Sequence, residues 1–173
     1  MNNITIRKAD PTDILALQNI AKETFLEAYS AKNTEEDMKQ YLTERFSIEQ
    51  LVSELNNPLS EFYFALSTET VVGYLKLNKG KSQAELKEQN TIEIERIYVL
   101  KTFQGNSIGQ LLCDTAIQIA QKEGADYIWL GVWEENHNAI SFYRKKGFIE
   151  FDKRIFKLGN DEQTDFMMKK DLT

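Results

Sequence analysis

The stretch from Glu93 to Gly109 limits the possible folds most, because it joins a strand, a loop and the start of a helix without a break. Residues 93–99 alternate with β-branched side chains, as a strand does, and a short polar loop follows. The helix predicted after the loop carries an apolar stripe at spacings of three and four, formed by Ile108, Leu111, Leu112, Thr115, Ala116, Ile119 and Ala120. Gly124 predicts its end. A strand feeding a helix in this way aims free backbone N–H groups at one point, which can hold a phosphate.

Two common phosphate-binding motifs are absent from the sequence. It contains neither G-x-x-x-x-G-K-[ST] nor G-x-G-x-x-G, which removes the main support for a nucleoside triphosphate or dinucleotide site. The loop instead has the shorter pattern Q-x-x-S-x-G, formed by Gln104, Gly105, Asn106, Ser107, Ile108 and Gly109. Taken alone, this pattern also fits an ordinary turn between a strand and a helix.

Together with the segment from Asn136 to Phe148, this loop resembles the two central motifs of the GNAT N-acetyltransferases. The family motifs are [QR]-x-x-G-x-[GA], for the pyrophosphate of acetyl-CoA, and N-x-x-A-x-x-F-Y-x-x-x-G-F. The second is matched at every position, whereas the first departs at Ser107, which still offers its backbone N–H. More narrowly, three stretches resemble the PaiA-type spermidine/spermine N-acetyltransferases: Glu93–Tyr98, Trp129–Glu134 and Glu162–Asp165.

The resemblance implies an α/β fold with a mixed central sheet of about seven strands and helices on both faces. The predicted order is strand, helices, three strands, helix, strand, helix and two strands. The first long helix is expected to bury Ile14, Leu17, Ala21, Phe25 and Ala28. Two short helices are expected between Thr34 and Leu55, each introduced by a capping signal. In this fold the early helical region borders the acceptor site.

Length and composition favour one domain over residues 1–173, in a cytoplasmic protein. The 173 residues are 42% apolar and 28% charged, and no apolar run approaches the about 20 residues of a membrane span. The net charge of −6 argues against nucleic acid and suits a cationic small substrate, although solubility alone explains it equally well. Cys113 is expected to be a buried small hydrophobe. A homodimer is left open.

The chemistry expected at the central strand is removal of a proton from an amine. An alkyl ammonium has a pKa of about 10.4, so near neutral pH few molecules carry the lone pair that attacks a thioester. Alternation places Glu93, Glu95, Ile97 and Val99 on one face, where a carboxylate could hold the ammonium and accept its proton. Alternatively, this face is wet and both carboxylates face solvent. The family resemblance favours Glu95 over Glu93.

The resemblance also assigns a cofactor and an acid. Tyr143 is expected to protonate the leaving thiolate, unless it only packs at the end of its helix. A backbone N–H near Tyr98 or Val99 is expected to face the thioester oxygen if a bulge leaves it unpaired. Acetyl-CoA is expected to pair its pantetheine arm with Ile97 and Val99 like an added strand. The full set of expected cofactor contacts is Ile97, Tyr98, Val99, Gln104, Gly105, Asn106, Ser107, Ile108, Gly109, Asn136, Asn138, Tyr143 and Lys145. No metal site is expected, because the one histidine, His137, has no visible partner.

Three functions are therefore compatible with the sequence. The first is acetylation of a small amine or polyamine. The second is acetylation of a protein or peptide, which needs a peptide groove. The third is a regulatory protein that senses acetyl-CoA without turnover, and the presence of both Glu95 and Tyr143 counts against it.

Overall fold

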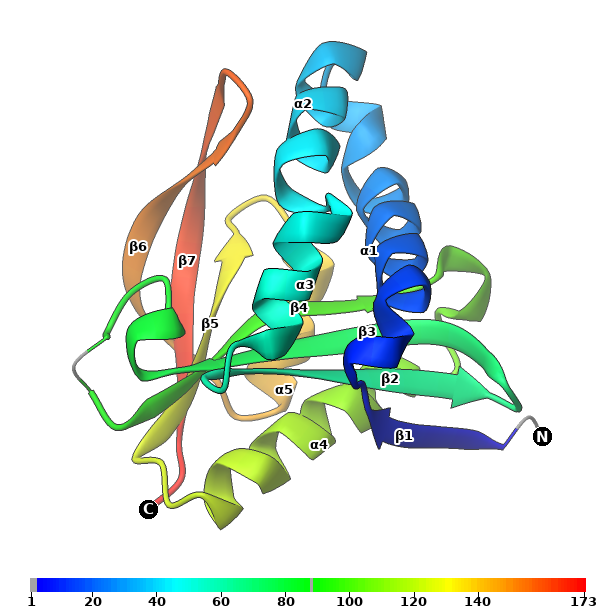
Figure 1. Ribbon diagram of the computed structural model, residues 1–173. Helices are drawn as coiled ribbons and strands as arrows, with labels where there is room; N and C mark the ends of the chain where they lie inside the picture. Colours follow the sequence, from blue (N-terminus) through cyan, green and yellow to red (C-terminus); the bar gives the residue numbers. More distant parts are fainter. Residues whose placement is uncertain (1–2, 88) are drawn as a thin grey trace.

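The computed structural model describes residues 3–87 and 89–173, which form one seven-stranded mixed sheet in the order β1-β2-β3-β4-β5-β7-β6 (Figure 1). The strands are β1 (Ile4–Lys8), β2 (Ser60–Ser67), β3 (Thr70–Lys79), β4 (Thr91–Val99), β5 (Tyr127–Trp133), β6 (Ile149–Leu158) and β7 (Asp161–Asp171). Only the central pair β4–β5 is parallel, and all other neighbours are antiparallel. The predicted order of helices and strands along the chain and the mixed sheet are confirmed.

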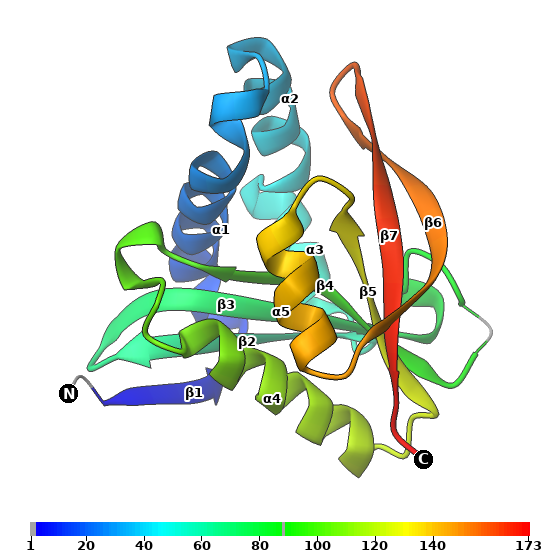
Figure 2. The same ribbon diagram turned by 180° about the vertical axis from the view of Figure 1, so that it is seen from behind.

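Helices cover both faces of the sheet, as predicted (Figures 1 and 2). One face is covered by α1 (Ile14–Tyr29), α2 (Glu35–Arg45) and α3 (Ile48–Asn56), and the other by α4 (Ile108–Lys122) and α5 (His137–Lys145). Short 3-10 turns are η1 (Pro11–Asp13), η2 (Ser30–Lys32), η3 (Gly80–Ser82) and η4 (Lys101–Phe103). Each face has its own apolar core, one beneath α1–α3 and one beneath α4 and α5.

Side-chain caps fix where the early helices begin. Asp10 accepts a hydrogen bond from the backbone N–H of Thr12 at 2.8 Å, and Asp13 accepts one from the N–H of Asp10 at 2.9 Å. Thr34 and Ser47 cap α2 and α3 in the same manner. Each cap satisfies a donor that the helix itself cannot use. The capping signals in the sequence therefore predicted these helix starts correctly.

Two residues of the predicted apolar stripes lie at the surface instead. Leu111 is 38% exposed, because the buried side of α4 runs through Ile108, Leu112 and Ala116 at steps of four. Ala28 is also exposed, and Tyr29 continues the inner side of α1, with its ring 4.7 Å from that of Phe25. Cys113 is fully buried, as predicted.

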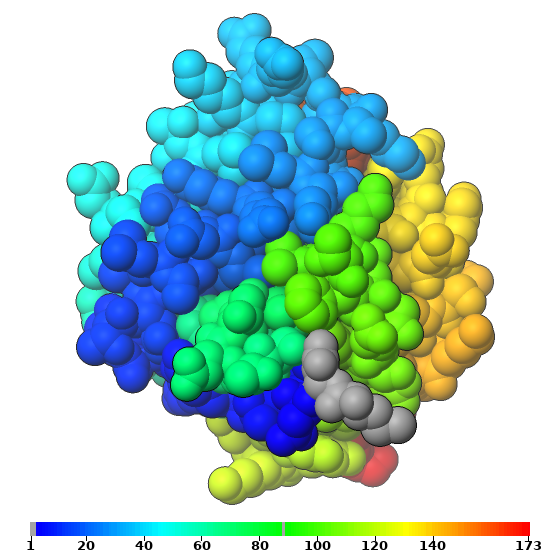
Figure 3. Space-filling view, turned by 90° about the vertical axis from the view of Figure 1, so that its right-hand side faces the viewer, coloured from blue at the N-terminus to red at the C-terminus, as the bar shows by residue number. Residues whose placement is uncertain are grey.

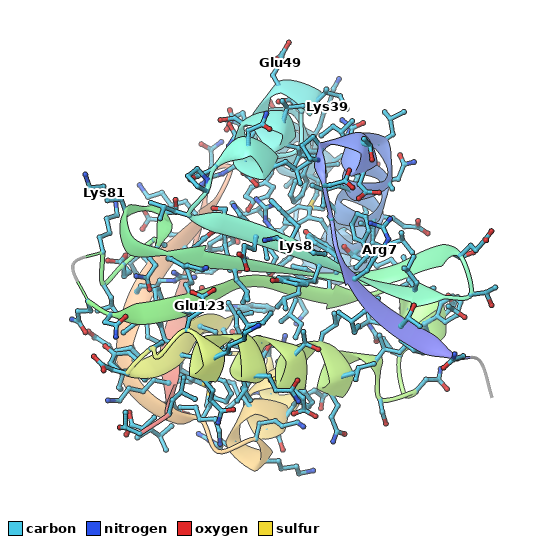
Figure 4. All side chains as sticks on the ribbon, turned by 60° about the horizontal axis from the view of Figure 1, so that its bottom comes forward. Arg7, Lys8, Lys39, Glu49, Lys81 and Glu123 are labelled. Atoms are coloured by element: carbon cyan, nitrogen blue, oxygen red, sulfur yellow. The ribbon has the colours of Figure 1, made fainter. Side chains whose placement is uncertain are left out.

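Salt bridges connect β1 to the turn before α1 and β3 to the end of α4. Figure 4 labels one residue of each pair, Arg7 and Glu123. Arg7 makes two hydrogen bonds of 2.8 Å to the carboxylate of Asp13, just before α1. Glu123, at the end of α4, lies 2.5 Å from the ammonium of Lys79 on β3. These pairs are partly exposed, so we expect them to orient elements more than to stabilise them.

A bulge in β4 overturns the predicted face of its side chains. Lys76 pairs with Arg96 and Leu77 pairs with Ile94, so Glu95 is one extra residue in β4. An extra residue shifts the alternation that follows it by one position. Glu93 and Glu95 therefore do not share a face with Ile97 and Val99. The residues of β4 that line the core beneath α4 and α5 are Ile92, Ile94, Ile97 and Val99.

The two parallel strands separate halfway along their length. β4 and β5 pair from Thr91 with Tyr127 to Ile94 with Leu130, and no further. Beyond that point residues 96–99 are in register only with β3, and residues 131–133 only with β7. Backbone groups of β4 are thus open on the β5 side. We call this gap between residues 95–99 and 131–133 the slot.

We predict that Gly73→Ala destabilises the protein by about 1–3 kcal/mol, because overpacking a close backbone contact forces the strands apart. A Cβ at Gly73 would lie 2.8 Å from the carbonyl oxygen of Tyr98 on β4, which cannot rotate away. Gly109→Ala is the control, since its Cβ would meet nothing closer than 4.0 Å and lies in the first turn of α4. Urea unfolding of both variants tests this. Equal midpoints would contradict it.

Candidate active site

The loop before α4 has the geometry of an anion site. Gly105 has φ +83° and Ser107 has φ +60°, both in the left-handed region, and residues 104–107 are exposed. Ser107 is the N-cap of α4 and makes no side-chain cap hydrogen bond. The first N–H groups of this 15-residue helix are therefore available to a bound anion. The positive φ of Ser107 also explains why glycine suits this position.

The other loop residues brace the turn. The side-chain amide of Gln104 donates to the carbonyl of Val99 at 3.1 Å, and that of Asn106 donates to the carbonyl of Phe103 at 3.1 Å. Ile108 is buried in the core, so it anchors the helix start by packing. The nearest atom to a Cβ at Gly109 would belong to Val99, which places the helix start beside the end of β4.

The residues predicted on α5 lie on the other side of the slot. Asn136 is the N-cap of α5, and its side-chain oxygen accepts from the N–H of Ala139 at 3.2 Å. Asn138 and His137 are exposed beside it. Lys145 is exposed and has no ion pair within residues 3–87 and 89–173, whereas its neighbours Arg144 and Lys146 each pair with a carboxylate.

Tyr143 is buried within the core that also contains Ile97 and Val99. Its ring packs edge to face on Phe142 and Phe148, at 5.2 and 5.6 Å. Burial raises the pKa of this phenol, with smaller contributions from Cys113 and Tyr98. The hydroxyl therefore stays protonated at neutral pH, as a proton donor must. A thiolate next to it would be desolvated too, which raises the pKa of its thiol in the same direction.

Glu95 is held by two cations. Its Oε2 lies 2.6 Å from Lys76 Nζ, and its Oε1 lies 3.5 Å from Arg96 Nη2. Asn78 donates a further hydrogen bond of 2.5 Å to Oε2. Burial alone would raise the pKa of Glu95, but Arg96 and Lys76 outweigh it and lower this pKa to about 2. The carboxylate, whose side chain is 29% exposed, is thus ionised at neutral pH.

Glu93 lies deeper than Glu95 and has a different balance of contacts. Its Oε2 accepts from the backbone N–H of Ala84 at 2.9 Å and from Asn78 at 3.1 Å. Its Oε1 is buried without a hydrogen bond in the described part of the chain. Burial raises the pKa of Glu93 despite these donors and nearby Arg154. One amide of Asn78 therefore joins both carboxylates that the sequence singled out.

The cations beside these carboxylates are Lys76, Arg96 and Arg154, which were not predicted from the sequence. Lys76 and Arg96 both reach Glu54 of α3, at 3.0 and 3.2 Å. Arg154 of β6 reaches Glu93 and Asp165. Lys76 alternates with Leu75 and Leu77 in β3, which signals a polar inner face, whereas simple alternation places Arg96 on the face opposite Glu95. Arg154 and Asp165 carry no such signal, because only the tertiary fold brings them to β4.

A bulge was expected to leave a backbone N–H near Tyr98 or Val99 unpaired, but the bulge in β4 lies elsewhere. It lies at Glu95, while Tyr98 stays in register with Tyr74 and Val99 with Gly73. The backbone of residues 96–99 is instead open on its other side, because β5 no longer pairs with β4 there. The Tyr98 side chain points toward α1, where its hydroxyl lies 3.1 Å from that of Tyr29.

The end of α1 borders the same region. In Figure 3 the blue helical segment that follows α1 reaches the yellow segment after β5, above the green loop that follows β4. Lys32 of η2 lies 4.4 Å from the centroid of the Trp133 ring. Among the acidic residues of this region, Glu27 accepts from the N–H of Lys101, and Asp37 accepts from the N–H of Asn160. These two carboxylates hold the loop after β4 and the turn between β6 and β7.

A groove of about 600 Å³ lies elsewhere, between α1 and α2. Leu26, Met38 and Leu42 line it, but none of the predicted catalytic or cofactor residues does. We place the candidate site at the slot, because the open backbone of β4 and the titratable groups converge there. In residues 3–87 and 89–173, no cluster of three or more His, Cys, Asp or Glu residues could hold a metal ion. None of the described helices is both long and apolar enough to cross a membrane.

Comparison with known proteins identifies the class to which this fold and site belong. Residues 14–148 match the Acetyltransferase (GNAT) family, and the chain belongs to that family. It is 37% identical over 172 residues to an uncharacterized N-acetyltransferase of Lactobacillus delbrueckii subsp. lactis, covering 99% of each chain. The chain is an N-acetyltransferase of the GNAT family, as the motifs predicted.

A characterised relative and a solved structure are similar over nearly the whole chain. The spermidine N(1)-acetyltransferase of Thermoplasma acidophilum is 28% identical over 172 residues, covering 97% of each chain. The PaiA N-acetyltransferase of the same organism, solved in complex with coenzyme A, superposes with a TM-score of 0.79 at 28% identity. The alignment covers 98% of this chain and 99% of that one. The predicted likeness to PaiA-type enzymes is confirmed.

The opposite pKa shifts of Glu95 and Glu93 predict opposite pH effects on stability. The pKa of Glu95 falls from 4.5 to about 2 on folding, so its stabilisation is full above 4.5 and is lost as pH falls toward 2. The pKa of Glu93 is raised on folding, so ionised Glu93 destabilises the fold at neutral pH, and acid relieves this.

We therefore expect the stability deficit of Glu95→Gln relative to wild type to shrink between pH 7 and pH 3. The stability of Glu93→Gln relative to wild type should instead fall over the same range. Urea unfolding at a series of pH values measures both differences. Parallel trends for the two variants would show that the charges of Lys76 and Arg96 do not act selectively on Glu95.

Proposed function

We propose that this protein transfers the acetyl group of acetyl-CoA to a primary amine, and that the acceptor is a polyamine such as spermidine or spermine. The observation that carries the proposal is the slot. It brings the open backbone of β4, the N-terminus of α4 and Tyr143 together at one opening in the sheet, with two carboxylates on its polar side. The spermidine acetyltransferase activity named for a relative of similar length supports the choice of acceptor.

The residues around the slot suit the parts of acetyl-CoA. The backbone of residues 104–109 would hold the pyrophosphate, with Lys145 and Asn138 close to the outer phosphates. Ile97, Tyr98 and Val99 would pair with the pantetheine arm as an added strand, and Asn136 would close the other side. When bound, acetyl-CoA supplies the thioester carbonyl that the amine attacks.

In the proposed reaction the acceptor first releases its ammonium proton to solvent, and the neutral amine nitrogen then forms a bond to the thioester carbon while the carbon–sulfur bond breaks. The nitrogen becomes far more acidic as this bond forms, so even a carboxylate with a low pKa can take its proton. We assign this role to Glu95, which is partly exposed, whereas Glu93 is fully buried. Tyr143 donates a proton to the departing sulfur.

We predict that Tyr143→Phe lowers kcat by ~10²-fold or more while the Kd for acetyl-CoA changes little, because only the proton donor is lost. Phe142→Leu is a control for altered packing, since its ring packs against Tyr143 but carries no hydroxyl. Stopped-flow turnover and calorimetric titration measure the two quantities. An unchanged kcat in Tyr143→Phe would return Tyr143 to a packing role.

We predict further that spermidine is acetylated with a lower KM than butylamine, and that this difference narrows as salt increases. Attraction between ammonium groups and partly exposed carboxylates is screened over about 8 Å at physiological ionic strength. Release of free CoA with each amine at low and high salt measures the effect. Equal use of butylamine, or turnover with peptides alone, would favour a general amine or protein acetyltransferase, and no turnover at all would favour an acetyl-CoA sensor.

A further inference from the structure

Arg154 lies between two carboxylates to which the proposed reaction gives no role. Its Nη1 is 3.6 Å from Glu93 Oε1, and its Nε is 3.4 Å from Asp165 Oδ2. The guanidinium lies against Gly131, where any Cβ would collide with it. Gly131 is the first residue of β5 beyond its pairing with β4, so this cation lies where the slot opens.

The contacts of Arg154 with Glu93 and Asp165 are long for a buried ion pair. Charge-assisted hydrogen bonds between nitrogen and oxygen are typically about 2.7–2.9 Å long, and both distances here exceed that range. Glu93 is fully buried and its Oε1 has no hydrogen bond in the described part of the chain, which is costly for a carboxylate. Burial also raises the pKa of Asp165 despite Arg154. Glu93 and Asp165 can therefore accept stronger hydrogen bonds from another cation than those that Arg154 donates.

Lys76 provides the contrast within the same face of the sheet. It contacts Glu95 at 2.6 Å and Glu54 at 3.0 Å, both short distances. The side chain of Lys76 is only 6% exposed, while that of Arg154 is 19% exposed. Arg154 stands on β6, an edge strand that pairs only with β7. Its long side chain can swing toward solvent without breaking the sheet.

We propose that Glu93 and Asp165 form a subsite for a second ammonium group of the acceptor, and that Arg154 fills this subsite when no acceptor is bound. This proposal rests on the amine acetylation proposed above. Asn78 Nδ2 lies 3.1 Å from Glu93 Oε2 and 2.5 Å from Glu95 Oε2, so an acceptor whose reacting nitrogen is at Glu95 has Glu93 close to its next nitrogen. A diamine must displace Arg154 from the subsite, whereas a monoamine need not. Arg154 is thus a specificity-determining residue that weakens binding of multiply charged acceptors.

Replacement of Arg154 by a neutral residue tests this proposal. In Arg154→Met, we expect the KM for 1,4-diaminobutane and for spermidine to fall about fivefold, which corresponds to one added ion pair at the upper end of ordinary strength. The KM for butylamine should stay within about twofold. Lys153→Met is the matched control, because this neighbouring side chain is exposed and lies over Phe166 instead. It should change none of the three values.

A binding measurement separates this proposal from the proposed function. Calorimetric titration of 1,4-diaminobutane into the CoA complex needs no turnover, and it should show tighter binding to Arg154→Met than to wild type. The double variant Glu93→Gln with Arg154→Met should lose that gain. The subsite would be overturned if Arg154→Met changed the affinity for butylamine as much as that for 1,4-diaminobutane. It would also be overturned if a folded Arg154→Met bound the diamine no more tightly than wild type does. Absence of acetylation with every amine would overturn the proposed function and leave the titration to decide the subsite.

Discussion

The extra residue at Glu95 in β4 determines which side chains face each half of the molecule. Without the bulge, Arg96 and Tyr98 would point toward α4 and α5, and Ile97 and Val99 would point toward α1–α3. With the bulge, all four isoleucine and valine residues that follow Thr91 in β4 enter one core. Glu93, Glu95 and Arg96 are gathered on the opposite face instead. The gathering of the carboxylates on one face is therefore a consequence of one irregular residue, whereas the slot depends on the departure of β5 from β4.

The polar face is stable only as a set of mutual contacts. Each buried charge loses much of its hydration, and the attraction between partners compensates only where the geometry is good. Glu54 meets two cations, and Lys76 meets the carboxylates of Glu54 and Glu95. Asn78 donates to Glu93 and to the same oxygen of Glu95 that Lys76 contacts. Removing one member would leave another buried without its partner, which costs more than the pair contributes. The loosest contact in the set, Arg154 with Glu93, is also the one that a ligand could most readily replace.

Much of the fold could be predicted because its signals are local. Asp10, Thr34 and Ser47 mark helix starts by capping, and Gly124 marks a helix end with φ +72°. The turn between β4 and α4 was also predictable, since it depends on neighbouring residues such as Gly105. Simple alternation failed at Glu95, because nothing in the sequence marks a bulge, and every later side chain of β4 was placed on the wrong face. Arg154 and Asp165 could not be found at all, since β6 and β7 meet β4 only through the order of strands in the sheet.

The division of the sheet into two faces suits the two reactants of the proposed transfer. The pantetheine arm and the thioester are largely apolar, and Tyr143, Ile97 and Val99 belong to the apolar core. The amine arrives charged, and the carboxylates that can receive it lie on the polar side. The reacting atoms of the two molecules can meet only where the sheet is interrupted. Because β5 leaves β4 after Ile94, that interruption adjoins both Glu95 and the start of α4. The same separation of strands thus opens β4 to an added strand and gives the amine a route to the thioester carbon.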